Sequence, residues 1–173
     1  MSNTFNNIEM NAMIFNGVEV ESWIHNGVEV YAGLSGKFII ENGVLNTKFA
    51  TGEYEVSSSY KGNAVGGTKT VSLMLNDKVI GRPMRLTLSG WVSGSCFNGQ
   101  ISRMAYVSCD GTKLVTIDLN IHAGGSSDKT VTVDFTPTTN LIEVGIHLTR
   151  EYKEEQSTQI DTQNSKIIDL QIL

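Results

Sequence analysis

Apolar and polar residues alternate along much of the second half of the chain. From Val115 to His122 every odd position is apolar and every even position is polar. Residues 131–135, 142–148 and 168–172 show the same period of two. Successive side chains of a β-strand point to opposite faces of the sheet, so this period indicates strands with one buried face. We therefore predict a series of half-buried strands.

Turn signals separate these segments. Asn42-Gly43, Asn98-Gly99 and Asp110-Gly111 are pairs that tight hairpin turns favour, because both central residues of such a turn need positive φ. No segment combines a period of 3.6 with capping residues, and residues 151–159 lack the apolar stripe of a helix. Residues 150–165 are polar and are predicted to form the longest loop. About ten short strands at this spacing predict an all-β antiparallel sandwich or barrel over residues 38–173.

A short repeat stands at the N-terminus. Residues 16–20, Asn-Gly-Val-Glu-Val, recur as residues 26–30. Two Asn-Gly turns ten residues apart predict a three-stranded β-meander, with strands at 12–15, 18–25 and 28–32. A Gly-Leu-Ser-Gly-Lys linker follows at 33–37, so we divide the chain into an attachment element, 1–33, and a sandwich domain, 38–173.

Both faces of the predicted meander carry large apolar side chains, and three short strands cannot bury both by themselves. One face could pack on the rest of the chain, or it could dock on another subunit, since exposed apolar patches often mark interfaces. On the second interpretation, the docking residues are Ile14, Phe15, Val18, Val20, Trp23, Ile24, Val28 and Val30.

Composition and charge exclude several classes of function. The 173 residues carry 13 Lys+Arg and 18 Asp+Glu, a formal net charge of −5, which argues against a nucleic-acid-binding protein. No apolar run is long enough to cross a bilayer, so we expect no membrane insertion, and the polar N-terminus does not resemble a secretory signal. The two cysteines, Cys96 and Cys109, are too few for a disulfide scaffold, and we expect free thiols.

The sequence contains no convincing catalytic set. His122 and His147 fall on the polar sides of their strands, and no pair of histidines has the spacing of a metal-binding motif. The Gly-rich stretch 61–68 lacks the Gly-Lys-Ser/Thr of a phosphate-binding loop. We therefore expect a protein that is not an enzyme and needs no metal or cofactor.

Two aromatic residues lie on predicted polar faces. Trp91 stands among Thr87, Ser89 and Ser93, and Tyr106 stands among Ser102, Met104 and Ser108. An aromatic ring beside hydrogen-bonding side chains can stack on a sugar ring while its neighbours bind the hydroxyls. The alternative is that both rings pack at the rim of the sheets. The candidate sugar-binding residues are Trp91, Tyr106, Asn120 and His122.

Two segments resemble known families. Residues 14–31, with their tandem Asn-Gly hairpins followed by a Gly-Ser linker, resemble N-terminal segments of bacteriophage tail, baseplate and other virion proteins. Residues 38–173 are similar to galactose-binding-like, jelly-roll carbohydrate-binding modules. That similarity rests on the order of the segments Leu86–Trp91, Val131–Phe135, Ile142–Leu148 and Lys166–Ile172.

Together these resemblances imply a structural component of a phage particle, in the tail, the baseplate or the capsid decoration. Its location would be the virion, and its partners would be other virion proteins, further copies of itself and host-surface glycans. The alternative is a stand-alone carbohydrate-binding module of a bacterial glycan-utilisation system.

Overall fold

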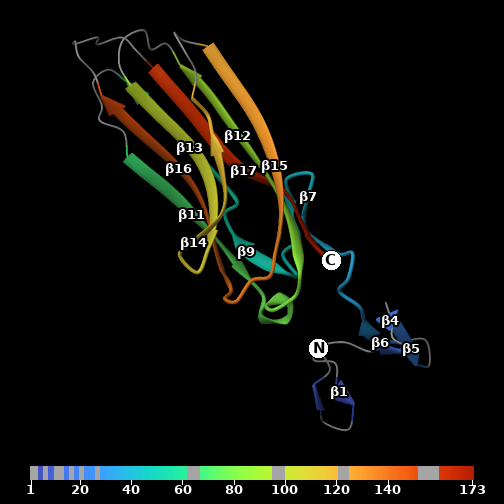
Figure 1. The fold of residues 1–173 in the computed structure, drawn as a ribbon. Helices are drawn as coiled ribbons and strands as arrows, with labels where there is room; N and C mark the ends of the chain where they lie inside the picture. Colours follow the sequence, from blue (N-terminus) through green and yellow to red (C-terminus); the bar gives the residue numbers. More distant parts are fainter. Residues whose placement is uncertain are drawn as a thin grey trace.

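The computed structural model describes residues 4–5, 8–9, 14–15, 18–19, 22–25, 28–61, 67–94, 100–120, 125–151 and 160–173. Apart from a short 3-10 turn at Asp77–Val79, the regular elements in these ranges are β-strands. The strands after residue 37 form two antiparallel sheets that face one another as a sandwich (Figure 1). The all-β prediction is confirmed, and the arrangement is consistent with a jelly roll.

The first sheet has six strands. Five follow the order β15 (Gly125–Phe135), β12 (Met84–Gly94), β17 (Ile160–Ile172), β7 (Phe38–Glu41) and β8 (Val44–Leu45), and β10 (Glu55–Lys61) also pairs with β17. The second sheet has five strands, in the order β14 (Thr112–Asp118), β13 (Gln100–Cys109), β16 (Leu141–Glu151), β11 (Gly67–Leu75) and β9 (Ala50–Gly52). We refer to them as the six-stranded and the five-stranded sheet.

The core lies between the sheets, where the alternation places it. Val115, Ile117 and Leu119 are buried, whereas Thr116 and Asp118 are exposed. The two sheets approach one another closely at Gly90 of β12. A Cβ atom there would lie 2.9 Å from the Cβ of Ala105 on β13, so a larger residue would push the sheets apart. This contact also shows that Gly90 and Ala105 face the interior.

The predicted tight turns are confirmed where the structure describes them. Asn42 and Gly43 have φ angles of 51° and 69°, and Asp110 and Gly111 have 51° and 70°. Positive φ at both central positions matches the right-handed twist of the paired strands, and Asn, Asp and Gly tolerate it best. The turn at Asn98-Gly99 lies outside the described residues.

The predicted loop at 150–165 is wrong at both ends. β16 continues to Glu151 and β17 begins at Ile160, so the polar stretch includes strand residues. Alternation did not reveal this start of β17 because its inward positions are polar. Gln163 is 1% exposed and Ser165 is fully buried, and both face the core.

The N-terminal strands form three separate hairpins. They are β1 (Thr4–Phe5) with β2 (Ile8–Glu9), β3 (Ile14–Phe15) with β4 (Val18–Glu19), and β5 (Ser22–His25) with β6 (Val28–Ala32). The expected middle strand at 18–25 is divided between β4 and β5, which belong to different two-stranded sheets, so the predicted three-stranded meander is wrong. An Asn-Gly turn pairs only the strands beside it, and therefore the repeat specifies hairpins but not their association.

The first of these hairpins was not expected. Its register, Phe5 opposite Ile8, repeats ten residues later as Phe15 opposite Val18 and again as His25 opposite Val28. The signal was present in the sequence, but Asn6-Asn7 stands where the later repeats have Asn-Gly. Within the described residues, no strand of the three hairpins pairs with either sheet of the sandwich.

Candidate functional site

The outward side of the six-stranded sheet is covered by polar side chains, and we call it the polar face. Its direction follows from alternation, because Gly90 and Val92 of β12 are buried and Trp91 between them points outward. The cross-strand registers add the residues of the neighbouring strands. The polar face consists of Arg85, Thr87, Ser89, Trp91, Ser93, Ser126, Asp128, Thr130, Thr132, Asp134, Thr162, Asn164, Lys166, Asp169, Gln171, Glu55, Ser57 and Ser59.

Trp91 is the aromatic residue of this surface. Its side chain is 37% exposed. In the register it stands opposite Asp128 of β15 on one side and Asn164 of β17 on the other. The indole is thus flanked by a carboxylate and a carboxamide, which supply hydrogen-bonding groups on both sides of an apolar ring.

Glu55 of β10 holds the side chain of Asn164 in place. Asn164 Nδ2 donates to Glu55 Oε1 over 2.7 Å, and Lys166 Nζ lies 3.1 Å from Glu55 Oε2. Partial burial, the largest single influence, raises the pKa of Glu55, but the hydrogen bonds from Asn164 and Lys166 and the charge of Lys166 together lower it further. Glu55 is therefore ionised at neutral pH and acts as an acceptor for both neighbours.

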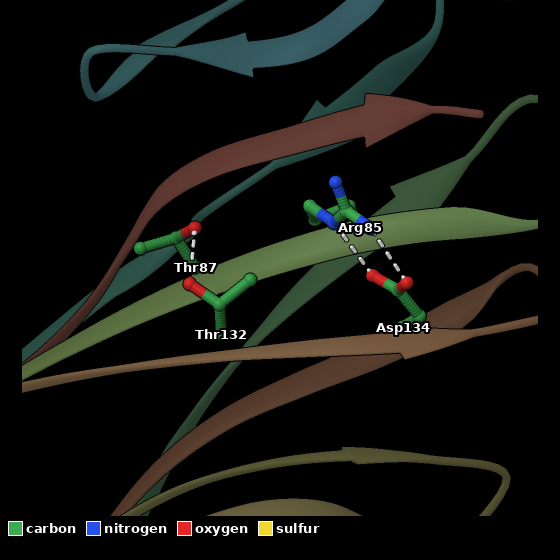
Figure 2. Close-up of polar contacts among 4 residues, drawn as sticks. All are labelled: Arg85, Thr87, Thr132 and Asp134. Carbon is green, nitrogen blue, oxygen red and sulfur yellow. Dashed lines mark hydrogen bonds and ion pairs between the residues drawn. The ribbon is translucent and has the colours of Figure 1, made fainter.

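A second ion pair lies at the other end of the polar face. Arg85 donates from Nε and from one terminal nitrogen to the two carboxylate oxygens of Asp134, both over 2.8 Å (Figure 2). Thr87 and Thr132 form the next pair on the same face of these two strands, and their Oγ1 atoms are hydrogen-bonded at 3.1 Å. The hydrogen bonds from Arg85, supported by its charge, outweigh slight desolvation and lower the pKa of Asp134.

Tyr106 lies on the opposite side of the molecule from the polar face. Ala105 faces the interior, so Tyr106 points outward from the five-stranded sheet, yet it is only 8% exposed. Lys113 Nζ lies 4.9 Å from the ring centroid. Burial, and then the charge of Glu143, raises the pKa of the Tyr106 hydroxyl. Trp91 and Tyr106 therefore do not line one groove.

Asn120, a further predicted sugar-binding residue, is not beside Trp91 either. Asn120 follows β14 in the five-stranded sheet, and its Oδ1 accepts from the backbone N–H of Arg103 over 2.8 Å. This bond stabilises the end of the strand. His122 lies outside the described residues. Of the three predicted residues that the structure describes, Trp91 lies on the polar face, and Tyr106 and Asn120 belong to the five-stranded sheet.

Three residues of the polar face beside Trp91 were missed from the sequence. Asp128 lies before the alternating segment 131–135. Extending the alternation backwards would have placed it on the same face as Asp134, because both have even residue numbers. Asn164 falls in the stretch predicted as a loop. Glu55 comes from a strand more than 100 residues away from Asn164, and no local signal links the two.

The predicted docking residues belong to the N-terminal hairpins, whose strand bounds and pairing are described. Seven of them lie in strands β3 to β6, and Val20 lies outside the described residues. Their role in docking remains a prediction.

Among the residues that the structure describes, no group of three or more His, Cys, Asp and Glu residues could hold a metal ion. No helix among these residues is long and apolar enough to span a membrane. Cys109 is a buried free thiol, and Cys96 lies outside the described ranges.

Comparison with known proteins gives only distant similarities. No protein-family model and no curated protein matches the sequence. Among solved structures, the chain is similar to that of infectious bursal disease virus, Gx strain, with 16% identity, a TM-score of 0.43 and coverage of 72% of this chain and 31% of that chain. The chain thus spans about a third of the length of this viral protein.

Two sugar-related structures are also similar. A CBM4 structure has 9% identity and a TM-score of 0.29 over 68% of this chain and 86% of that chain. The C-terminal domain of EclA, a sugar-binding protein, has 13% identity and a TM-score of 0.31 over 70% of this chain and 79% of that chain.

Proposed function

We propose that this protein is a non-enzymatic structural component of a bacteriophage particle. The N-terminal hairpins attach it to other virion proteins, and the sandwich is displayed and contacts host-surface glycans through the polar face. The observation that carries the proposal is the array of three hairpins that repeats every ten residues. The described strands of this array pair with no strand of the sandwich. A two-stranded hairpin is marginally stable in water, so an array of them gains most from a partner.

The charge of the hairpin segment indicates what that partner offers. Before Lys37 the chain contains four glutamates and no lysine or arginine. Glu9, Glu19 and Glu29 occupy equivalent register positions, opposite Thr4, Ile14 and Ile24. Two such segments repel each other, whereas an apolar surface rimmed by Lys or Arg attracts them. In a homo-oligomer, a symmetric basic partner then holds the copies together, and the N-terminal hairpins of different copies do not contact each other.

Deletion of residues 1–33 tests the attachment. The truncated chain should retain its β-sheet circular dichroism and cooperative thermal unfolding, because the described core residues all lie after the deleted segment. When it is co-expressed with the proteins encoded beside it, it should be absent from purified particles that contain the full chain. A truncated chain that still enters particles contradicts the proposal, and so does one that unfolds.

The second candidate is a stand-alone carbohydrate-binding module. It is favoured by the exposure of Trp91 between Asp128 and Asn164. Light scattering separates the candidates. A full-length monomer that binds glycan, and that co-purifies with no particle, supports the free module.

A further inference from the structure

The surroundings of Trp91 leave its ring open to a flat ligand. Its neighbours two residues along β12 are Ser89 and Ser93, which are both small. Across the strands its partners are Asp128 and Asn164, and Ser57 of β10 lies opposite Asn164. These neighbours are serine, aspartate and asparagine, whose side chains are all shorter than the indole, and Trp91 is 37% exposed. The CH groups of a ring-shaped polyol can therefore reach the indole.

The hydrogen-bonding groups beside the ring are rich in acceptors. Asp128, when ionised, accepts hydrogen bonds and donates none. Asn164 uses Nδ2 to bind Glu55, and this bond determines which way its carboxamide is turned. A ligand with many hydroxyl donors fits such a pair, because each hydroxyl can donate to a carboxylate or carboxamide oxygen.

The charges on the polar face disfavour an anionic ligand. Four carboxylates occupy it, at Glu55, Asp128, Asp134 and Asp169, against two cations, Arg85 and Lys166. Arg85 is bound to Asp134 and Lys166 to Glu55. Among the described side chains of the polar face, each cation is thus already neutralised, and Asp128 next to Trp91 would repel a uronate or a sulfate.

We infer that the polar face binds an uncharged oligosaccharide, with one sugar ring stacked on Trp91, its hydroxyls bonded to Asp128 and Asn164, and Glu55 as a positioning residue for Asn164. This inference rests on the glycan contact in the proposed function and names the class of its ligand. It does not involve the N-terminal hairpins.

The test is a titration of the full chain with hexasaccharides, followed by isothermal calorimetry at one ionic strength. The uncharged probes are built from glucose, mannose, galactose or N-acetylglucosamine, and hexagalacturonate is the anionic probe. At least one uncharged probe should bind, and hexagalacturonate should bind at least tenfold more weakly. Tighter binding of hexagalacturonate overturns the inference, and so does the absence of binding by every uncharged probe. Particle incorporation, measured separately, still tests the proposed attachment in that case.

Variants locate the ligand on the polar face. Trp91→Ala should abolish binding, Trp91→Phe should retain part of it, and Asn164→Ala should weaken it. Met74→Ala is the matched control, because Met74 is a similarly exposed apolar residue, at 39%, in the five-stranded sheet. Unchanged binding by Trp91→Ala, or equal losses in Trp91→Ala and Met74→Ala, overturns the inference.

Glu55→Gln tests the positioning role. It should weaken binding by about tenfold, the equivalent of roughly one charge-assisted hydrogen bond. The side-chain amide resonance of Asn164 should shift in the free protein, while the melting temperature changes little. Loss of binding without a shift of the Asn164 amide would place Glu55 in direct contact with the ligand and overturn its positioning role.

Discussion

Trp91 and Tyr106 have similar neighbours in the sequence but opposite surroundings in the fold. Each points outward from a sheet and has serine or another small or flexible residue two positions away. Trp91 is 37% exposed and Tyr106 is 8% exposed. The difference lies in the cross-strand partners, which are Asp128 and Asn164 for Trp91 but Thr116 and Gly145 for Tyr106.

Gly145 explains the burial of Tyr106. A Cβ atom on Gly145 would overlap the tyrosine ring, so the ring occupies the space that a side chain would otherwise fill. Lys113 then covers the exposed side of the ring. An aromatic residue on a polar strand face is therefore buried when a glycine on the neighbouring strand leaves room for its ring. Trp91 has Asp128 and Asn164 as cross-strand partners and stays exposed, whereas Tyr106 serves as a packing residue.

The largest expected effect comes from removing the ring of Tyr106, with Trp91 as the comparison. Tyr106→Ala should lower the free energy of unfolding by about 3 kcal/mol, because it empties a well-packed site. Trp91→Ala should change it by no more than about 0.5 kcal/mol, as expected for an exposed position. Urea denaturation of both variants gives the two values. Equal losses would remove the distinction between the two residues.

A substitution at Gly145 sharpens the same comparison. Gly145→Ala should cost about 1–3 kcal/mol, because the new methyl group overlaps the ring of Tyr106. The cost should shrink in a Tyr106→Ala background, and a double-mutant cycle by urea denaturation measures this coupling. Additive effects would show that the ring does not occupy the space beside Gly145.

Asn164 and Ser165 extend the comparison to polar residues on one strand. Asn164 serves the polar face, whereas the Ser165 hydroxyl is buried and makes no hydrogen bond among the described residues. Ser165→Ala should therefore raise the free energy of unfolding by about 1 kcal/mol, since a buried unpaired hydroxyl is removed. Thermal unfolding, with Ser57→Ala on the polar face as control, checks the sign. Destabilisation would indicate that the hydroxyl has a partner.

The smallest expected effect is on the pH dependence of stability. Because the pKa of Glu55 is lowered by folding, its contribution to stability is fully present above its unfolded pKa and is lost as the pH falls through the folded pKa. Glu55→Gln should therefore reduce stability at neutral pH slightly and make the acid loss shallower. Chemical denaturation at pH 7 and in the acid range measures this. A steeper acid loss in the variant would contradict the lowered pKa.

The local direction of most side chains was predictable from the sequence. Alternation correctly assigned Ile117 and Leu119 to the core, and it also sets Trp91 outward, next to buried Val92. The Asn42-Gly43 turn was equally local, because its positive φ angles depend on the two residues themselves. The strand at 160–165 escaped the pattern because Gln163 and Ser165 place polar groups in the interior.

The composition of the site was decided by tertiary structure. Asp128, Asn164 and Glu55 reach the surroundings of Trp91 from three other strands, and their positions depend on the registers of β15, β17 and β10. Likewise, the Asn-Gly repeat specified hairpins, but the association of those hairpins did not follow from it. The physical reason is that a period of two sets the face of each side chain within its own strand. Which strands become neighbours depends on pairing between segments far apart in the chain.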